Sequence, residues 1–141
     1  MHPTQTRHGG FTLIEILVVV LILGLLASVV APNLLGKVGG ARAKAAKVQV
    51  EDLGAALDLY YLEVGAYPTT EQGLNALVER PAGSDRWNGP YLKKTQVPRD
   101  PWDRDYHYRS PGEHGPYDLY SYGADNAEGG TDDGADIVSW K

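Results

Sequence analysis

The apolar run at residues 11–31 constrains this chain more than any other feature of its sequence. The run (FTLIEILVVVLILGLLASVVA) is apolar or glycine except for Thr12, Glu15 and Ser28. A helix of about 20 such residues crosses the roughly 30 Å hydrocarbon core of a bilayer. The run therefore predicts a membrane-spanning helix, preceded by the short polar segment 1–10 (MHPTQTRHGG).

A cleaved secretory signal peptide is the alternative interpretation of this run. In such a peptide the apolar region is about 7–15 residues long, and a small-residue cleavage site follows it. Here the run is longer, and the candidate site Val29-Val30-Ala31 is followed directly by Pro32. The sequence therefore favours a helix that is retained.

The net charge of −5 hides an asymmetry between the two parts of the chain. Residues 1–50 hold five Lys/Arg and one acid, a net +4, whereas residues 51–141 hold eight bases and seventeen acids, a net −9. Nucleic-acid binding needs a basic surface for the phosphates, so we expect no nucleic-acid partner. The chain has no cysteine, which excludes disulfides and thiolate chemistry.

The segment Gly10-Phe11-Thr12-Leu13-Ile14-Glu15 resembles the type IV prepilin signature. The resemblance implies that a membrane-bound prepilin peptidase cuts between Gly10 and Phe11 and methylates the new N-terminus. A carboxylate inside a membrane span is costly unless it finds a partner. The resemblance supplies one for Glu15, the Phe11 ammonium of an adjacent subunit, because opposite charges offset each other's desolvation.

The positive-inside rule gives the opposite orientation. Only Arg7 precedes the span, while the basic cluster Lys37, Arg42, Lys44 and Lys47 follows it, so charge counting places the C-terminal part in the cytoplasm. We give precedence to the leader motif, because the peptidase that reads it acts at the cytoplasmic face. The expected location is the inner membrane, with a single span and a periplasmic C-terminal domain.

Pro32 lies inside what should be one continuous helix. Proline removes a backbone donor and clashes with the preceding turn, so we expect a kink or local melting there. An ordinary helix break at the membrane edge is the simpler interpretation. In pilin-like filaments, however, the same region loosens when subunits pack, and the resemblance therefore makes Pro32 an assembly residue together with Phe11 and Glu15.

Beyond the span, apolar residues recur at alternating steps of three and four along residues 43–64, which predicts an amphipathic helix. Thr69-x-x-Gln72 is a capping box before a short helix. A short strand is expected near Tyr91-Leu92, a hairpin from 106–108 and 117–120, and a last short strand at 137–140. The expected class is α+β and pilin-like: a long N-terminal helix, membrane-spanning in its first half, packed on a small antiparallel β-sheet.

Four sequence blocks resemble, in order, the major pseudopilins of type II secretion systems. The blocks are Tyr67-Pro68-Thr69-Thr70-Glu71-Gln72-Gly73-Leu74, Asp100-Pro101-Trp102, Pro111-Gly112-Glu113-His114-Gly115 and Tyr117-Asp118-Leu119. Major type IV pilins share the helix but usually close their C-terminal region with a disulfide, which this chain cannot form. The resemblance implies a cleaved leader at 1–10, an assembly helix at 11–36 and a periplasmic head at 37–141.

The implied function is that of the structural subunit of a periplasmic pseudopilus, which drives export of folded proteins through the outer membrane. The implied partners are other copies of the chain, minor pseudopilins, the inner-membrane secretion platform, the prepilin peptidase and the bilayer. Two alternatives stay open, a type IV adhesion or competence pilin and a membrane-anchored periplasmic binding or sensor domain. No catalytic motif is present, and His107 and His114 lack a supporting pattern, so we expect no enzyme.

The acidic, glycine-rich stretch 122–136 (YGADNAEGGTDDGAD) has two interpretations. On composition it is a solvated acidic turn, although calcium also prefers such carboxylate and carbonyl oxygens. The pseudopilin resemblance favours calcium, because major pseudopilins bind it in this loop. The expected ligands are the side chains of Asp125, Asp136 and one or both of Asp132 and Asp133, with backbone carbonyls near Tyr122 and Thr131.

Overall fold

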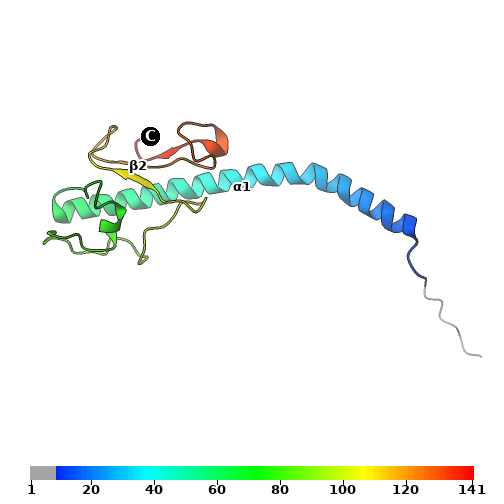
Figure 1. Cartoon of the computed structure of the whole chain (residues 1–141), viewed down its shortest axis with the longest axis horizontal. Helices are drawn as coiled ribbons and strands as arrows, with labels where there is room; N and C mark the ends of the chain where they lie inside the picture. Colours follow the sequence, from blue (N-terminus) through cyan, green and yellow to red (C-terminus); the bar gives the residue numbers. More distant parts are fainter. Residues whose placement is uncertain (1–8) are drawn as a thin grey trace, which may run out of the picture. The chain divides into compact units, whose positions relative to one another are not determined.

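The computed structural model describes residues 9–141, except for the side chains of residues 31–35. It divides the chain into two units at Lys37/Val38. Helix α1 (Leu13–Val64) contributes to both units (Figure 1). Its helical assignment continues across Pro32, and the expected weak point at this residue stays a prediction.

The N-terminal unit consists of the first part of α1 and the residues before it. Leu13–Val30 has a mean hydropathy of 3.0 and no buried residue, so by length and composition it is able to cross a membrane. A signal sequence passes the same test. The large apolar side chains here are exposed, Phe11 by 79% and Leu13 by 85%, as expected for a surface that contacts lipid or other helices.

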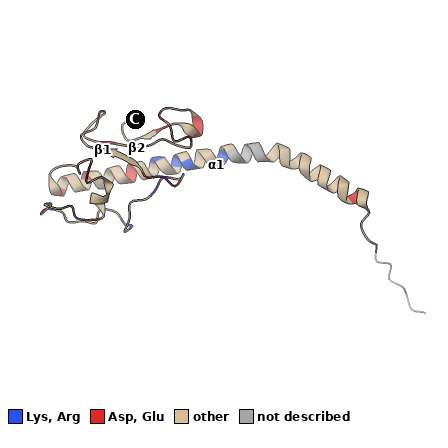
Figure 2. Ribbon diagram, viewed as in Figure 1, with Lys and Arg blue, Asp and Glu red and all other residues tan. Residues whose placement is uncertain are grey.

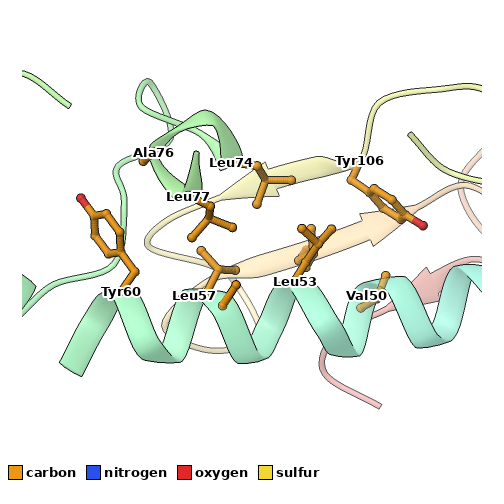
Figure 3. Close-up of a cluster of buried hydrophobic side chains, with 10 residues drawn as sticks. Val50, Leu53, Leu57, Tyr60, Leu74, Ala76, Leu77 and Tyr106 are labelled. Atoms are coloured by element: carbon orange, nitrogen blue, oxygen red, sulfur yellow. The ribbon is translucent and has the colours of Figure 1, made fainter. Parts of the chain in front are cut away.

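The core of the second unit forms between the later part of α1 and the segments that follow it. Val50, Leu53, Leu57 and Tyr60 are buried, as the predicted stripe requires. Leu53 and Leu57 face side chains from the 3₁₀ helix η1 (Leu74–Leu77), and Val50 lies nearer Tyr106 (Figure 3). Tyr106 and Leu119 complete this core from the sheet side. The amphipathic helix is therefore confirmed.

A three-stranded antiparallel sheet packs over α1, with strand order β1-β2-β3. Strands β1 (His107–Arg109) and β2 (Asp118–Ser121) form the predicted hairpin, shifted by one residue, with Tyr108 opposite Leu119. Strand β3 (Ile137–Val138) pairs with β2. The predicted α+β, pilin-like class is confirmed.

One predicted element is wrong. Tyr91 and Leu92 lie in a loop, where the Tyr91 backbone amide donates to the Leu77 carbonyl (2.7 Å) and its hydroxyl donates to Glu63 (2.7 Å). The capping box, in contrast, is present, since Thr69 and Gln72 exchange backbone-to-side-chain hydrogen bonds of 2.9 and 3.2 Å. Gly73, with φ +58°, separates this box from the helix that follows, which is a short 3₁₀ helix.

Candidate functional site

The segment before α1 presents the predicted cleavage bond in the open. Gly10 and Phe11 are exposed and precede the first helical residue, Leu13. A peptidase needs an accessible substrate outside regular secondary structure, and the Gly10–Phe11 bond is exposed and outside the helix.

Thr12 caps the helix that follows, a role that the sequence interpretation missed. The Glu15 backbone N–H donates to both the Thr12 carbonyl (3.1 Å) and the Thr12 hydroxyl oxygen (3.3 Å). Thr12-x-x-Glu15 has the residue types and spacing of a capping box, which was the available signal. Glu15 therefore lies in the first turn, where a negative charge is favoured by the helix dipole.

The acidic C-terminal loop is wound closely around the carboxylate of Asp125. Its Oδ1 accepts a hydrogen bond from the Ala127 amide (3.1 Å). Its Oδ2 lies so near the returning chain that β-carbons placed on Gly130 and Gly134 would be 2.9 and 2.8 Å away. Glycine at these positions lets the backbone approach the carboxylate closely.

Asp136 closes the same loop from its other end. Its Oδ2 accepts from the Gly129 amide (2.9 Å), and its own amide donates to the Gly129 carbonyl (3.2 Å). Its Oδ1 is buried and accepts no hydrogen bond from any residue in the described part of the chain. A buried acceptor without a partner is costly, and a cation would satisfy it. The carboxylate oxygens of Asp125 and Asp136 are ligands of the hard type that calcium prefers.

Asp132 and Asp133 do not form one cluster with Asp125 and Asp136 in the described part of the chain. Asp133 lies against Gly39 of α1, and Asp132 begins the 3₁₀ turn η2 (Asp132–Gly134) with φ +52°. Within residues 9–141, no three Asp, Glu or His side chains are close enough to share a metal ion. The Thr131 carbonyl accepts from the Gly134 amide (3.0 Å). The calcium site, including Tyr122 and Thr131, stays a prediction.

The buried carboxylate of Asp118 organises the turn between β1 and β2. It accepts hydrogen bonds from the backbone amides of Glu113 (2.9 Å) and His114 (3.1 Å), and His114 Nδ1 lies 3.2 Å from it. Burial acts to raise the pKa of Asp118, but these hydrogen bonds outweigh it and hold the pKa below the ordinary value. The His114 ring also stacks on Trp140, with centroids 4.0 Å apart. His114 therefore has a structural role here.

Charged residues are distributed unevenly in Figure 2, with Lys and Arg along part of α1 and Asp and Glu in the C-terminal loop. Among the described residues, Asp100 is the other buried carboxylate. Its Oδ2 accepts a 2.6 Å hydrogen bond from the buried Ser121 hydroxyl. In the sequence, Asp100 was noted only as part of a block that resembles the pseudopilins. Its Asx turn, Trp102 N–H to Asp100 Oδ1 (3.0 Å), is the local signal for a structural role.

Comparisons with known proteins bear on both ends of the chain. Residues 33–140 match the family described as type II secretion system (T2SS), protein G, and residues 5–31 match the prokaryotic N-terminal methylation motif. The core protein G of the Pseudomonas aeruginosa type II secretion system is 50% identical over 140 residues, with 96% of this chain and 97% of that protein covered. The Vibrio cholerae protein is 49% identical, with 95% and 92% covered.

A solved structure is similar as well. The crystal structure of the major pseudopilin from the type 2 secretion system of enterohaemorrhagic Escherichia coli superimposes with a TM-score of 0.65 at 34% identity. The match covers 77% of this chain and 91% of that one.

Proposed function

The chain belongs to the type II secretion system protein G family, and we propose that it is the repeating subunit of a pseudopilus that drives export of folded proteins through the outer membrane. The observation that carries the proposal is the family match over residues 33–140, joined to a pilin-like fold shared with a major pseudopilin. The resemblance drawn from the four sequence blocks is thereby confirmed. The role is structural rather than catalytic.

An apolar helix at the N-terminus, together with the methylation motif, fits anchoring in a membrane. We place the chain in the inner membrane as a single-pass protein, with the head from residue 37 onward in the periplasm. The family match supports this orientation over the one from charge counting, because a periplasmic filament needs its heads outside the cytoplasm.

Assembly in this proposal depends on the first residues of the mature chain. Cleavage between Gly10 and Phe11 creates an ammonium group, and Glu15 lies in the first turn of α1, fixed by the Thr12 cap. In the membrane, the Glu15 carboxylate of one subunit pairs with the Phe11 ammonium of its neighbour, and each offsets the other's desolvation.

Calcium would hold the C-terminal loop of the head closed. Asp125 and Asp136 would ligate the ion with their free carboxylate oxygens, and backbone carbonyls of the loop would add ligands. The ion neutralises two carboxylates that otherwise repel each other at the two ends of one loop. The unpartnered Asp136 Oδ1 supports this proposal.

Membership of the family implies assembly with other components of the secretion system. The partners that we propose are further copies of this chain, minor pseudopilins and the inner-membrane secretion platform. The prepilin peptidase acts before assembly, and the bilayer holds the subunits until they enter the filament.

A Glu15→Val variant tests the proposed role. In a strain whose own gene is deleted, the wild-type chain should restore secretion of exoproteins to the medium and give filaments when overproduced. The variant should insert into the membrane as well as the wild type, since a buried charge is removed. It should fail in both secretion and filament formation, because the neighbouring Phe11 ammonium is left buried and unpaired. Normal secretion by this variant would contradict the assembly role.

A further inference from the structure

Arg104, in the loop between η1 and β1, reaches across to the residues that follow β2. Its Nη1 donates to the Gly123 carbonyl (2.7 Å) and its Nη2 to the Ala124 carbonyl (3.2 Å). These two residues directly precede Asp125 in the chain. One planar guanidinium therefore fixes two consecutive carbonyl groups on the segment that leads to Asp125.

The backbone of Arg104 is itself held in place by hydrogen bonds to Asp100. Buried Asp100 accepts hydrogen bonds from the Arg104 amide (2.9 Å) and, through its other oxygen, from the Ser121 hydroxyl (2.6 Å). The Asp100 amide donates to the Arg104 carbonyl (2.8 Å). Since Ser121 is the last residue of β2, this network ties Arg104 to the sheet and not merely to another loop.

The returning end of the acidic loop packs on the same two residues. The Ala124 amide donates to the Asp133 carbonyl (2.9 Å). Gly123 has φ +69°, and a β-carbon there would lie 2.7 Å from the Ala135 carbonyl oxygen. Gly123 and Ala124 thus lie between the Arg104 guanidinium and residues 133–135. The chain leading to Asp136 is therefore positioned against the dipeptide that leads to Asp125.

We propose that Arg104 is a positioning residue for calcium, which fixes Gly123 and Ala124 and so sets the separation of Asp125 from Asp136 before the ion binds. The inference rests on the proposed calcium function of this loop. Without the guanidinium, two like-charged ends of a glycine-rich loop separate in the free protein. Calcium then has to restore their order, which weakens binding, since ordering costs reduce affinity.

The positive charge of Arg104 lowers calcium affinity, because it repels a dication, whereas its hydrogen bonds are proposed to raise that affinity. The hydrogen-bonding geometry and the charge are separated by two substitutions. Arg104→Lys keeps the charge and loses the planar fork, while Arg104→Met loses both and keeps a long side chain. If positioning dominates, both variants bind calcium about 10- to 100-fold more weakly, as is typical when a group that orients a metal ligand is removed.

The experiment titrates calcium chloride into the full-length chain in detergent, by calorimetry, for the wild type and both variants. Arg99→Lys is the matched control, since Arg99 lies in the same loop and pairs with Asp103 (3.4 Å) and Asp105 (3.5 Å). It should bind calcium as the wild type does. The Lys variant keeps the test valid if the Met variant does not fold.

A second measurement needs no calcium. In chelator, hydrogen exchange at the Ala124 amide should be at least several-fold faster in Arg104→Lys than in the wild type and in Arg99→Lys. An unchanged exchange rate, or tighter calcium binding by Arg104→Met, would overturn the positioning role. If the wild type does not bind calcium, both the calcium proposal and the role of Arg104 are overturned. If the wild type binds calcium and both Arg104 variants bind it with the same affinity, only the role of Arg104 is overturned.

Discussion

Gly39 of helix α1 lies directly against the carboxylate of Asp133 in the acidic loop, so that a β-carbon at position 39 would overlap that side chain. The next residue, Gly40, is different, because no neighbour among the described residues lies within 4 Å of the position that its β-carbon would take. Adjacent glycines in one helix therefore face a loop contact and open space. Alanine substitutions at these two positions therefore distinguish the effect of helix propensity on stability from the effect of contact with the loop.

We expect Gly40→Ala to stabilise the head by about 0.5–1 kcal/mol, because alanine is the better helix former. Gly39→Ala brings the same gain in propensity but displaces Asp133, so it should be less stable than Gly40→Ala by about 1 kcal/mol. Thermal unfolding of the full-length chain in detergent measures the difference as a few degrees in Tm. Equal Tm values would mean that the loop yields at no cost.

Processing is the second prediction. Mature protein should begin at Phe11 and carry one added methyl group, as the leader motif requires. Intact-mass measurement of the chain from cells with an active prepilin peptidase tests this directly. A Gly10→Leu variant, whose cleavage site is blocked by its size, should keep the mass of the uncut chain. Recovery of wild-type protein that still begins at Met1 would contradict the prediction.

Calcium should stabilise the head through the acidic loop. For a site with a dissociation constant of ~10⁻⁴ M, millimolar calcium adds on the order of 1–2 kcal/mol. Tm should therefore rise by several degrees relative to chelator, while magnesium, which is reluctant to lose its waters, should not replace calcium.

Two substitutions in this loop make that measurement specific. Asp125→Asn should abolish the calcium-dependent shift, because Asp125 lies within the wound part of the loop. Glu128→Gln removes the same charge from an exposed position nearby and should keep most of the shift. Identical melting curves for the wild type in calcium and in chelator would return the loop to a solvated acidic turn.

Asp118 should make stability depend on acid pH. Because its pKa lies below the ordinary value of 3.8 in the folded head, its ionised form stabilises the fold. That contribution is complete above the ordinary value and is lost as pH falls through the lower, folded-state pKa.

Asp118→Asn tests this contribution. At pH 7 it should cost about 1–3 kcal/mol, since charge-assisted hydrogen bonds to Glu113 and His114 are weakened. The cost should shrink as the pH falls below 4. Asp85→Asn, at an exposed position, is the control and should change little. A cost for Asp118→Asn that is independent of pH would show that the charge is not the cause.

The elements that follow from local pattern were predictable from the sequence. The three-and-four spacing from Ala46 to Tyr60 gave the buried face of α1, and alternation with a Gly/Pro turn gave the hairpin. The strand predicted at Tyr91 is absent, because the backbone and hydroxyl of this residue bond to Leu77 and Glu63. These residues are distant in the sequence, so a local hydrophobic pattern does not predict the contacts.

The residues of the candidate site also differ in how far they could be predicted from the sequence. Asp125 and Asp136 were expected as ligands from the pseudopilin resemblance, since composition alone indicates a solvated turn, whereas the placement of Asp133 against Gly39 involves a residue far away in the sequence. The hydrogen bonds made by Asp100 and Arg104 could not be predicted either. Arg104 donates to backbone carbonyl groups, which every residue has, so no residue type in the sequence indicates the contact.

The head is joined to its helix by tyrosine hydroxyls. Tyr67 donates to Asp58 (2.8 Å), Tyr91 to Glu63 (2.7 Å) and Tyr106 to Gln49. Burial, together with the bond to Asp58, raises the pKa of Tyr67 to about 12, so this hydroxyl keeps its proton in alkaline surroundings. Since the chain has no cysteine, these attachments form without an oxidant and are not broken by a reductant. Folding of the head therefore needs no thiol oxidation, whatever the redox poise of its surroundings.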